Sequence, residues 1–275
     1  MNTKQLMSGL ALAVLTVVTS ANSCSNTSPN ADSDNQSASL ISEDTQQAVV
    51  NGNSVTYGSH TYTVEGTIGL EGEDKNADGV IDNAGYQGKA TSKVTFTNIP
   101  SGYAEFEAVY SALLGKSIMG TVAMIPMAME IYARDNATGE KCVKLLCGEE
   151  NSSTVIRSLQ SKFKATSAND NDPYIQRYLP AALLDGAKPD NAYTPNSPYT
   201  VCMTASVNKP QKFMGNGNNA GTVHYVYILT SGGWDTMQRS VEILKKNNSE
   251  LHTVFNCPAV YVQCQYIQGE WAGLK

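Results

Sequence analysis

The sequence predicts an α+β fold, in which a small N-terminal β-hairpin unit precedes several helices and a four-stranded antiparallel sheet. Apolar residues alternate with polar ones in Gly52–Pro100, and they recur at helical spacing after Ser101-Gly102. From Tyr199 onwards Val, Tyr, Ile and Thr dominate. Alternation is typical of half-buried strands and a 3.6-residue period of amphipathic helices. Helices grouped apart from strands indicate an α+β class.

The first unit, residues 51–100, contains two expected strands. In Thr61–Leu70 every second residue is apolar, from Tyr62 to Leu70, with Gly66 as the one exception. Lys93–Ile99 alternates in the same way. This period of two favours half-buried antiparallel strands, and a loop rich in Gly, Asp and Asn joins them.

Helical spacing predicts four helices, over Ala104–Leu114, Ser117–Asp135, Ser152–Lys164 and Asp172–Leu184. Pro126 is expected to kink or break the second helix, because proline lacks the N–H group of an internal hydrogen bond. Asp172 and Pro173 suit the N-cap and first helical position of the fourth helix.

The strand-rich segment Tyr199–Gln265, within residues 101–275, is expected to form a four-stranded antiparallel meander. Its strands are expected over Tyr199–Ala205, Thr222–Ser231, Arg239–Lys246 and Leu251–Gln265. Turn-forming clusters of Gly, Asn and Ser separate them, as between strands of a meander. Residues 101–275 are therefore expected to form one α+β domain.

The composition excludes some classes of partner. The chain has 275 residues, a formal net charge of −6 and no block of Lys or Arg. An acidic surface without a basic patch argues against nucleic acid as a partner. Hydrophobic residues make up 41% of the chain, which is enough to fill a core.

The first 23 residues are typical of a bacterial export signal. Lys4 precedes the apolar run Leu6–Ser20, and Ala21-Asn22-Ser23-Cys24 follows. The run is shorter than the roughly 20 residues of a spanning helix, and small residues precede the cleavage point. The site resembles a lipobox, with Ala21 in place of the usual Leu, which implies a lipid on Cys24 and a palmitoylated, membrane-anchored protein outside the cytoplasm. Cleavage by the ordinary signal peptidase is the alternative.

Residues 24–50 are expected to be a disordered tether between the lipid and the folded body. Ser25–Val50 contains no aromatic residue, and its few apolar residues lie near its end. Such a segment buries too little surface to offset the entropy of ordering it.

After Cys24 the chain has an odd number of cysteines, namely Cys142, Cys147, Cys202, Cys257 and Cys264. Each lies among apolar neighbours, which favours mostly buried thiols with at most one or two disulfides. On a regular strand, the seven-residue spacing of Cys257 and Cys264 would place them on opposite faces.

The segment Asp74–Asp82 reads D-x-N-x-D-G-x-x-D, which resembles the first nine positions of EF-hand and dockerin calcium loops. Oxygen ligands at positions 1, 3, 5, 7 and 9 converge on one cation, and Gly at position 6 permits the turn. The predicted calcium ligands are Asp74, Asn76, Asp78, Asp82 and the carbonyl of Val80. The calcium would have a structural role in the hairpin.

Two features depart from that pattern. Position 12 is Gly85 instead of a bidentate Glu, and the flanks are strand-like. A modest affinity is therefore expected, of the order seen in extracellular modules, about 10⁻⁴–10⁻³ M. The alternative is a metal-free hairpin, since Asn-Ala-Asp-Gly is a good turn sequence.

Aromatic and charged residues in two segments are candidates for ligand binding. Tyr174, Arg177 and Tyr178 share one face of the expected fourth helix. Trp234 and Asp235 follow Gly232-Gly233, where a Trp can form a stacking lip. The alternative for both segments is that these side chains pack against the sheet and bind no ligand. His224 and His252 lack a metal-binding motif and are expected to be packed or surface residues.

The stretches Trp234–Thr236, Arg239–Lys245 and Val254–Asn256 resemble a recurring C-terminal domain of uncharacterised secreted bacterial proteins, including Bacteroidetes-type lipoproteins. The resemblance covers roughly Gly102–Lys275, and it implies no catalytic residue because the domain has no known function. Helices followed by a curved sheet also resemble the cone-shaped folds of the NTF2 or cystatin kind, which is an analogy of fold alone.

These features favour a non-enzymatic binding or interaction module anchored in the cell envelope, with an unknown extracytoplasmic ligand or protein as partner. The alternative is a hydrolase- or isomerase-like enzyme with its site in a cone-shaped cavity, where Tyr174, Arg177, His224 and Asp235 would meet. A structural role in a surface assembly is a third hypothesis, which a large exposed apolar patch would favour.

Overall fold

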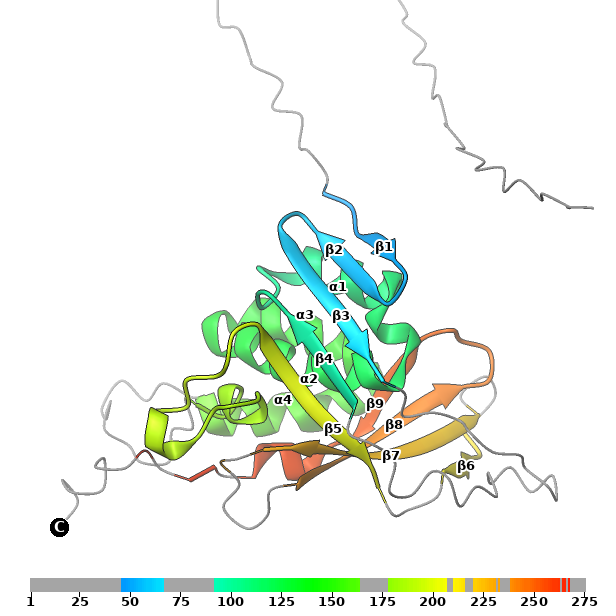
Figure 1. Cartoon of the computed structure of the whole chain (residues 1–275). Helices are drawn as coiled ribbons and strands as arrows, with labels where there is room; N and C mark the ends of the chain where they lie inside the picture. Colours follow the sequence, from blue (N-terminus) through cyan, green and yellow to red (C-terminus); the bar gives the residue numbers. More distant parts are fainter. Residues whose placement is uncertain are drawn as a thin grey trace, which may run out of the picture. The chain divides into compact units, whose positions relative to one another are not determined.

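A computed structural model describes residues 46–66, 92–163, 178–206, 210–215, 220–230, 232, 238–262, 264, 265 and 267. Within these ranges four α-helices accompany one large antiparallel sheet (Figure 1). The predicted α+β class is therefore confirmed.

The sheet has nine strands in the described ranges, so the predicted count of four was wrong. The strands are β1 (Val49–Asn51), β2 (Ser54–Tyr57), β3 (His60–Glu65), β4 (Ser92–Phe96), β5 (Tyr199–Ala205), β6 (Gln211–Phe213), β7 (Gly221–Leu229), β8 (Gln238–Lys246) and β9 (His252–Asn256). Their order is β1-β2-β3-β4-β5-β7-β8-β9, and β6 pairs with β7 beside this path.

The N-terminal hairpin and the C-terminal strands belong to the same sheet, because β4 pairs with β5. The register places Val94 opposite Val201 and Phe96 opposite Tyr199. Val94, Phe96 and Val201 are almost completely buried. Burial of these apolar side chains on one face joins the strands before residue 100 to those after residue 199.

The helices are α1 (Tyr103–Ala112), α2 (Ile118–Arg134), α3 (Asn136–Cys147) and α4 (Glu149–Phe163). The predicted helices at Ala104–Leu114, Ser117–Asp135 and Ser152–Lys164 correspond to α1, α2 and α4. The expected break at Pro126 does not occur, since α2 continues through it. No helix was predicted at α3, which begins where the Asp135 carboxylate caps the N–H groups of Ala137 and Thr138.

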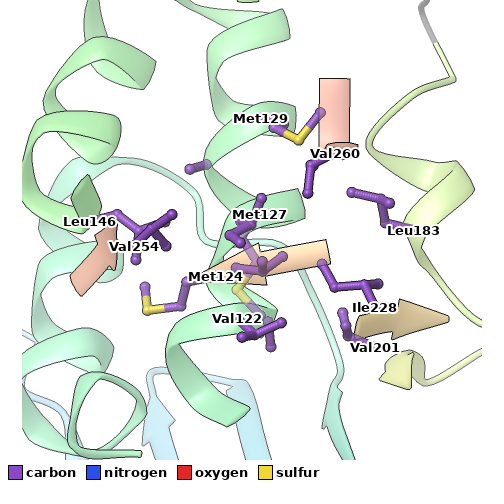
Figure 2. Packing of buried hydrophobic residues seen from close by; sticks show 14 of the residues in the cluster. Val122, Met124, Met127, Met129, Leu146, Leu183, Val201, Ile228, Val254 and Val260 are labelled. Atoms are coloured by element: carbon purple, nitrogen blue, oxygen red, sulfur yellow. The ribbon is translucent and has the colours of Figure 1, made fainter. Parts of the chain in front are cut away.

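The core is built around α2, in which every residue from Ile118 to Met129 is buried. A helix that is apolar all round must be enclosed by other elements. Figure 2 shows this packing, with Val122, Met124, Met127 and Met129 of α2 close to Leu146, Leu183, Val201, Ile228, Val254 and Val260. Within the described ranges, none of the helices combines the length and the hydropathy that a membrane span requires.

Two expected elements differ in the structure. Residues 178–184 form a turn and a short 3-10 helix, Ala181–Leu183, where the fourth helix was expected; residues 172–177 lie outside the described ranges. The last expected strand ends at Asn256, and a 3-10 helix, Pro258–Tyr261, follows it. Pro258 has no N–H group to donate and its fixed φ suits the first turn of the 3-10 helix, where it lies.

Candidate functional site

Most of the residues singled out in the sequence lie outside the described residues. These are the lipidation candidate Cys24, the calcium-loop residues Asp74, Asn76, Asp78, Val80 and Asp82, and the ligand-binding candidates Tyr174, Arg177, Trp234 and Asp235. Tyr178 is described, and so is Gly232, which precedes Trp234 by two positions in the sequence. The candidate site is therefore built from these two positions.

Tyr178 stacks on Tyr193. The ring centroids lie 5.4 Å apart, and the ring planes differ by 12°. Tyr193 is buried, whereas Tyr178 is only partly buried. An offset pair of this kind adds about 0.5–1.5 kcal/mol beyond the burial of its area. The stack leaves part of one aromatic side chain accessible beside a fixed one.

Tyr193 also connects this aromatic pair to the turn after β7. Its hydroxyl donates to the backbone carbonyls of Gln265 and of Gly232, the latter at 3.5 Å. A Cβ atom at Gly232 would lie 2.4 Å from the Tyr193 ring, so only glycine permits this approach. The structure thus brings Tyr178 and the Gly232 turn together through Tyr193, a residue that sequence reasoning missed.

The backbone at Tyr193 has an uncommon conformation. Ala192 and Tyr193 have φ values of 53° and 55°, in the left-handed region that residues with a Cβ atom seldom adopt. Asn191 stabilises this turn, because its Nδ2 donates to the carbonyls of Gly186 (2.8 Å) and Thr194 (3.0 Å). Strained conformations persist where the surroundings fix them, and they gather at functional sites.

Arg239 and Cys264 lie beside Tyr193 in the protein interior, with exposed fractions of 3% and 2%. Burial raises the pKa of the Tyr193 hydroxyl, the Cys264 thiol adds to the rise, and the Arg239 guanidinium opposes it. Burial also raises the pKa of the Cys264 thiol. Both groups therefore stay protonated at neutral pH, so Tyr193 is a hydrogen-bond donor and Cys264 is a poor nucleophile.

A second polar cluster joins β3 to the first turn of α1. The Glu105 carboxylate is 2% exposed. Its Oε1 lies 2.6 Å from His60 Nδ1 and accepts a 2.6 Å hydrogen bond from the Tyr62 hydroxyl. Its Oε2 accepts from the Ser101 N–H (2.7 Å) and the Ser101 hydroxyl (2.9 Å). The carboxylate therefore ties the hairpin to the start of α1.

These contacts determine the charge of Glu105. Burial alone would raise its pKa, but hydrogen bonds from Ser101, Tyr62 and His60 outweigh burial and leave the pKa below its usual value. Charge-assisted bonds of this kind are about twice as strong as neutral ones. Nothing in the sequence pattern marked this cluster, although Glu in the first turn of a helix is a known capping signal.

The other two histidines are buried in the sheet, as packed residues. His224 is fully buried, and burial, with a contribution from His252, lowers its pKa to about 4. His252 Nδ1 lies 3.0 Å from the Gly115 carbonyl, and burial lowers the pKa of His252 as well. Both imidazoles are therefore neutral at pH 7, which fits the expectation that they are packed residues.

The five cysteines expected to be mostly buried are free thiols, and all except the partly buried Cys202 are buried. The Cys257 thiol lies 3.0 Å from the Tyr261 hydroxyl, and burial raises its pKa to about 12. Among the described residues, no three His, Cys, Asp or Glu side chains gather as a metal site would require.

The fold and the site define an α+β domain in which one long helix and its neighbours pack on a nine-stranded antiparallel sheet. The chain belongs to the family described as domain of unknown function DUF6935, which matches residues 98–268. This match confirms the resemblance of the C-terminal region to a domain of unknown function. No curated protein matches the chain. No solved structure matches it either, and the likeness to NTF2 or cystatin cones stays a prediction.

Proposed function

We propose that the protein is a lipoprotein of the bacterial cell envelope whose folded domain is a non-enzymatic binding or interaction module. The observation that carries the proposal is the sequence Ala21-Asn22-Ser23-Cys24 at the end of an apolar run. An apolar segment of this length, followed by small residues, suits an export signal. The lipid on Cys24 would hold the domain at a membrane outside the cytoplasm.

The geometry of the Glu105 cluster gives this carboxylate a structural role. This buried carboxylate is engaged in holding α1 to the hairpin. The neutral, buried His224 and His252 are poorly placed for proton transfer with a substrate at neutral pH, since a general base needs a pKa near the working pH.

The binding face in this proposal is the region where Tyr193 links the partly exposed Tyr178 to Gly232 after β7. Tyr178 is a partly exposed aromatic side chain, fixed by stacking on a buried tyrosine. Rigid aromatic side chains offer a large contact area at a small cost in conformational entropy. The other ligand-binding candidates, Tyr174, Arg177, Trp234 and Asp235, lie outside the described residues.

Acylation of Cys24 is tested by growing expressing cells with an alkyne analogue of palmitate. We expect the wild-type protein to carry the label and to sediment with membranes. The Cys24→Ser variant should lose both properties, because the thiol is the only acceptor at that site. A labelled Cys24→Ser variant, or an unlabelled wild type that is nevertheless exported and cleaved, would contradict the anchor.

The binding face is tested by placing the photo-reactive residue p-benzoyl-phenylalanine at position 178 in intact cells. The aromatic replacement preserves much of the shape of Tyr178. Met214, which is 74% exposed, is the matched control position. We expect illumination to produce an adduct from position 178 that position 214 does not produce. Equal adducts from both positions, or none from position 178, would count against this face.

A further inference from the structure

Strand β1 is an edge strand of the sheet among the described residues. It pairs with β2 and is the first strand in the order, as Figure 1 shows. Val49 is 61% exposed and Val50 is 47% exposed. With Met214, they are the exposed large hydrophobic residues of the described part of the chain. Alternate residues of an edge strand direct their N–H and C=O groups away from the sheet, which makes the edge a template for another strand.

The sequence of this edge carries neither of the two residue types that most often prevent pairing. Natural sheets shield their edges with charged side chains, proline, bulges or covering elements. Residues 46–51, Gln-Gln-Ala-Val-Val-Asn, contain neither a charge nor a proline. At the opposite edge, by contrast, the backbone carbonyl of His252 in β9 accepts a 2.5 Å hydrogen bond from the buried Tyr110 hydroxyl of α1.

We propose that β1 pairs in antiparallel fashion with β1 of a second copy of this chain, which extends the sheet across two molecules. An uncharged strand meets its own copy without like-charge repulsion, and antiparallel pairing centred on Val50 sets Val50 against Val50 of the partner copy and Val49 against Asn51. A two-fold contact of this kind uses both edges at once. It therefore gives a closed dimer and leaves no β1 edge for a third copy.

The position of β1 in the chain favours a second copy as the occupant. This step rests on the proposed lipid anchor at Cys24. Residues 25–45 separate that anchor from Gln46, a span of at most about 75 Å when extended. Two copies anchored in one membrane would thus present the same strand within the same distance of the surface. Because β1 has only 3 residues, it offers few backbone hydrogen bonds to a partner strand. We therefore expect weak pairing in solution and stronger pairing on a membrane.

The first test needs no lipid. Sedimentation equilibrium is measured on the full mature chain carrying Cys24→Ser, from micromolar to millimolar concentration. We expect a monomer–dimer equilibrium that Val50→Lys weakens by about two- to fivefold, because the two-fold axis brings the new charges together. Val49→Lys serves as an independent second variant. Met214→Lys adds the same charge to another exposed apolar position and should leave the dimer unchanged.

The second test uses lipidated chains labelled with a donor or an acceptor at the C-terminus and bound to phospholipid vesicles. Energy transfer that Val50→Lys removes and Met214→Lys preserves would support the proposal. A chain that stays monomeric in both tests would overturn it, as would a dimer that tolerates both valine substitutions or an assembly larger than a dimer. Acylation of Cys24 is measured separately, so a failed dimer test does not contradict the proposed lipid anchor. A dimer in solution together with an unacylated Cys24 would contradict the anchor but would still support pairing through β1.

Discussion

Protonation of His224 is predicted to destabilise the folded domain at acidic pH. The side chain is fully buried on β7, and burial lowers its pKa from 6.5 to about 4. Because the unfolded chain binds this proton near pH 6.5 and the folded chain only near pH 4, acid favours the unfolded state. The stabilisation by neutral His224 is complete above pH 6.5 and is lost as the pH falls towards 4.

The size of the effect follows from the pKa difference. Each unit of pKa corresponds to about 1.4 kcal/mol, so the shift of His224 amounts to about 3 kcal/mol of unfolding free energy. That is a large share of the roughly 5–15 kcal/mol that stabilises a typical domain. The effect should therefore be measurable with ordinary denaturant titrations.

The assay is urea unfolding of the wild type and of His224→Gln at pH 7 and pH 4. Gln cannot take up a proton, so the fall in unfolding free energy between the two pH values should be about 3 kcal/mol smaller in the variant. Equal m-values would show that the comparison is valid. An equal fall in both proteins would refute the assignment of this acid sensitivity to His224.

The remaining predictions concern the Glu105 cluster and the calcium loop. Replacing Glu105 by Gln should lower the unfolding free energy by about 2 kcal/mol, since the charge-assisted bonds to Ser101 and Tyr62 are lost. The lowered pKa of Glu105 also means that its stabilisation is present above the usual pKa of 4.5 and is lost on acidification below it. An unchanged urea midpoint at pH 7 would contradict this role. Calcium titrated by calorimetry into the metal-stripped mature chain should release heat that Asp78→Ala abolishes. The exposed Asp190→Ala serves as control, and equal binding by both variants would exclude the loop.

Local patterns in the sequence predicted several elements correctly, because they reflect which face of an element is buried. Alternation of Tyr62 and Val64 with polar residues identified β3, and the apolar spacing of residues 118–132 identified α2. Pro126 was expected to kink or break this helix, and the break does not occur, since enclosure of α2 by other elements outweighs the cost of one proline in its interior.

Helix α3 was missed although its ends carry readable signals. Asp135 is its N-cap, and Gly148 follows its last turn with φ of 74°. The segment is amphipathic but weakly apolar, so the spacing of its few buried residues was not recognised. Cap residues mark helix ends where hydrophobic spacing is faint.

The candidate site was only partly accessible to sequence reasoning. Tyr178 and the Gly232 turn were each selected for their residue types, but their connection depends on Tyr193. Tyr193 is distant from Gly232 in the chain and adopts a left-handed backbone that no local motif indicated. The Glu105 cluster likewise joins residues more than 40 positions apart.

The sequence by itself determined the fold class, the periodic elements, the apolar character of α2 and the export-signal pattern before Cys24. These are local properties, set by composition and by the spacing of apolar residues along the chain. Only the tertiary structure decided that β4 pairs with β5, that Glu105 ties the hairpin to α1 and that β1 is the edge strand among the described strands. Alternation shows which face of a strand is buried, but the neighbour of a strand depends on complementary packing between distant segments.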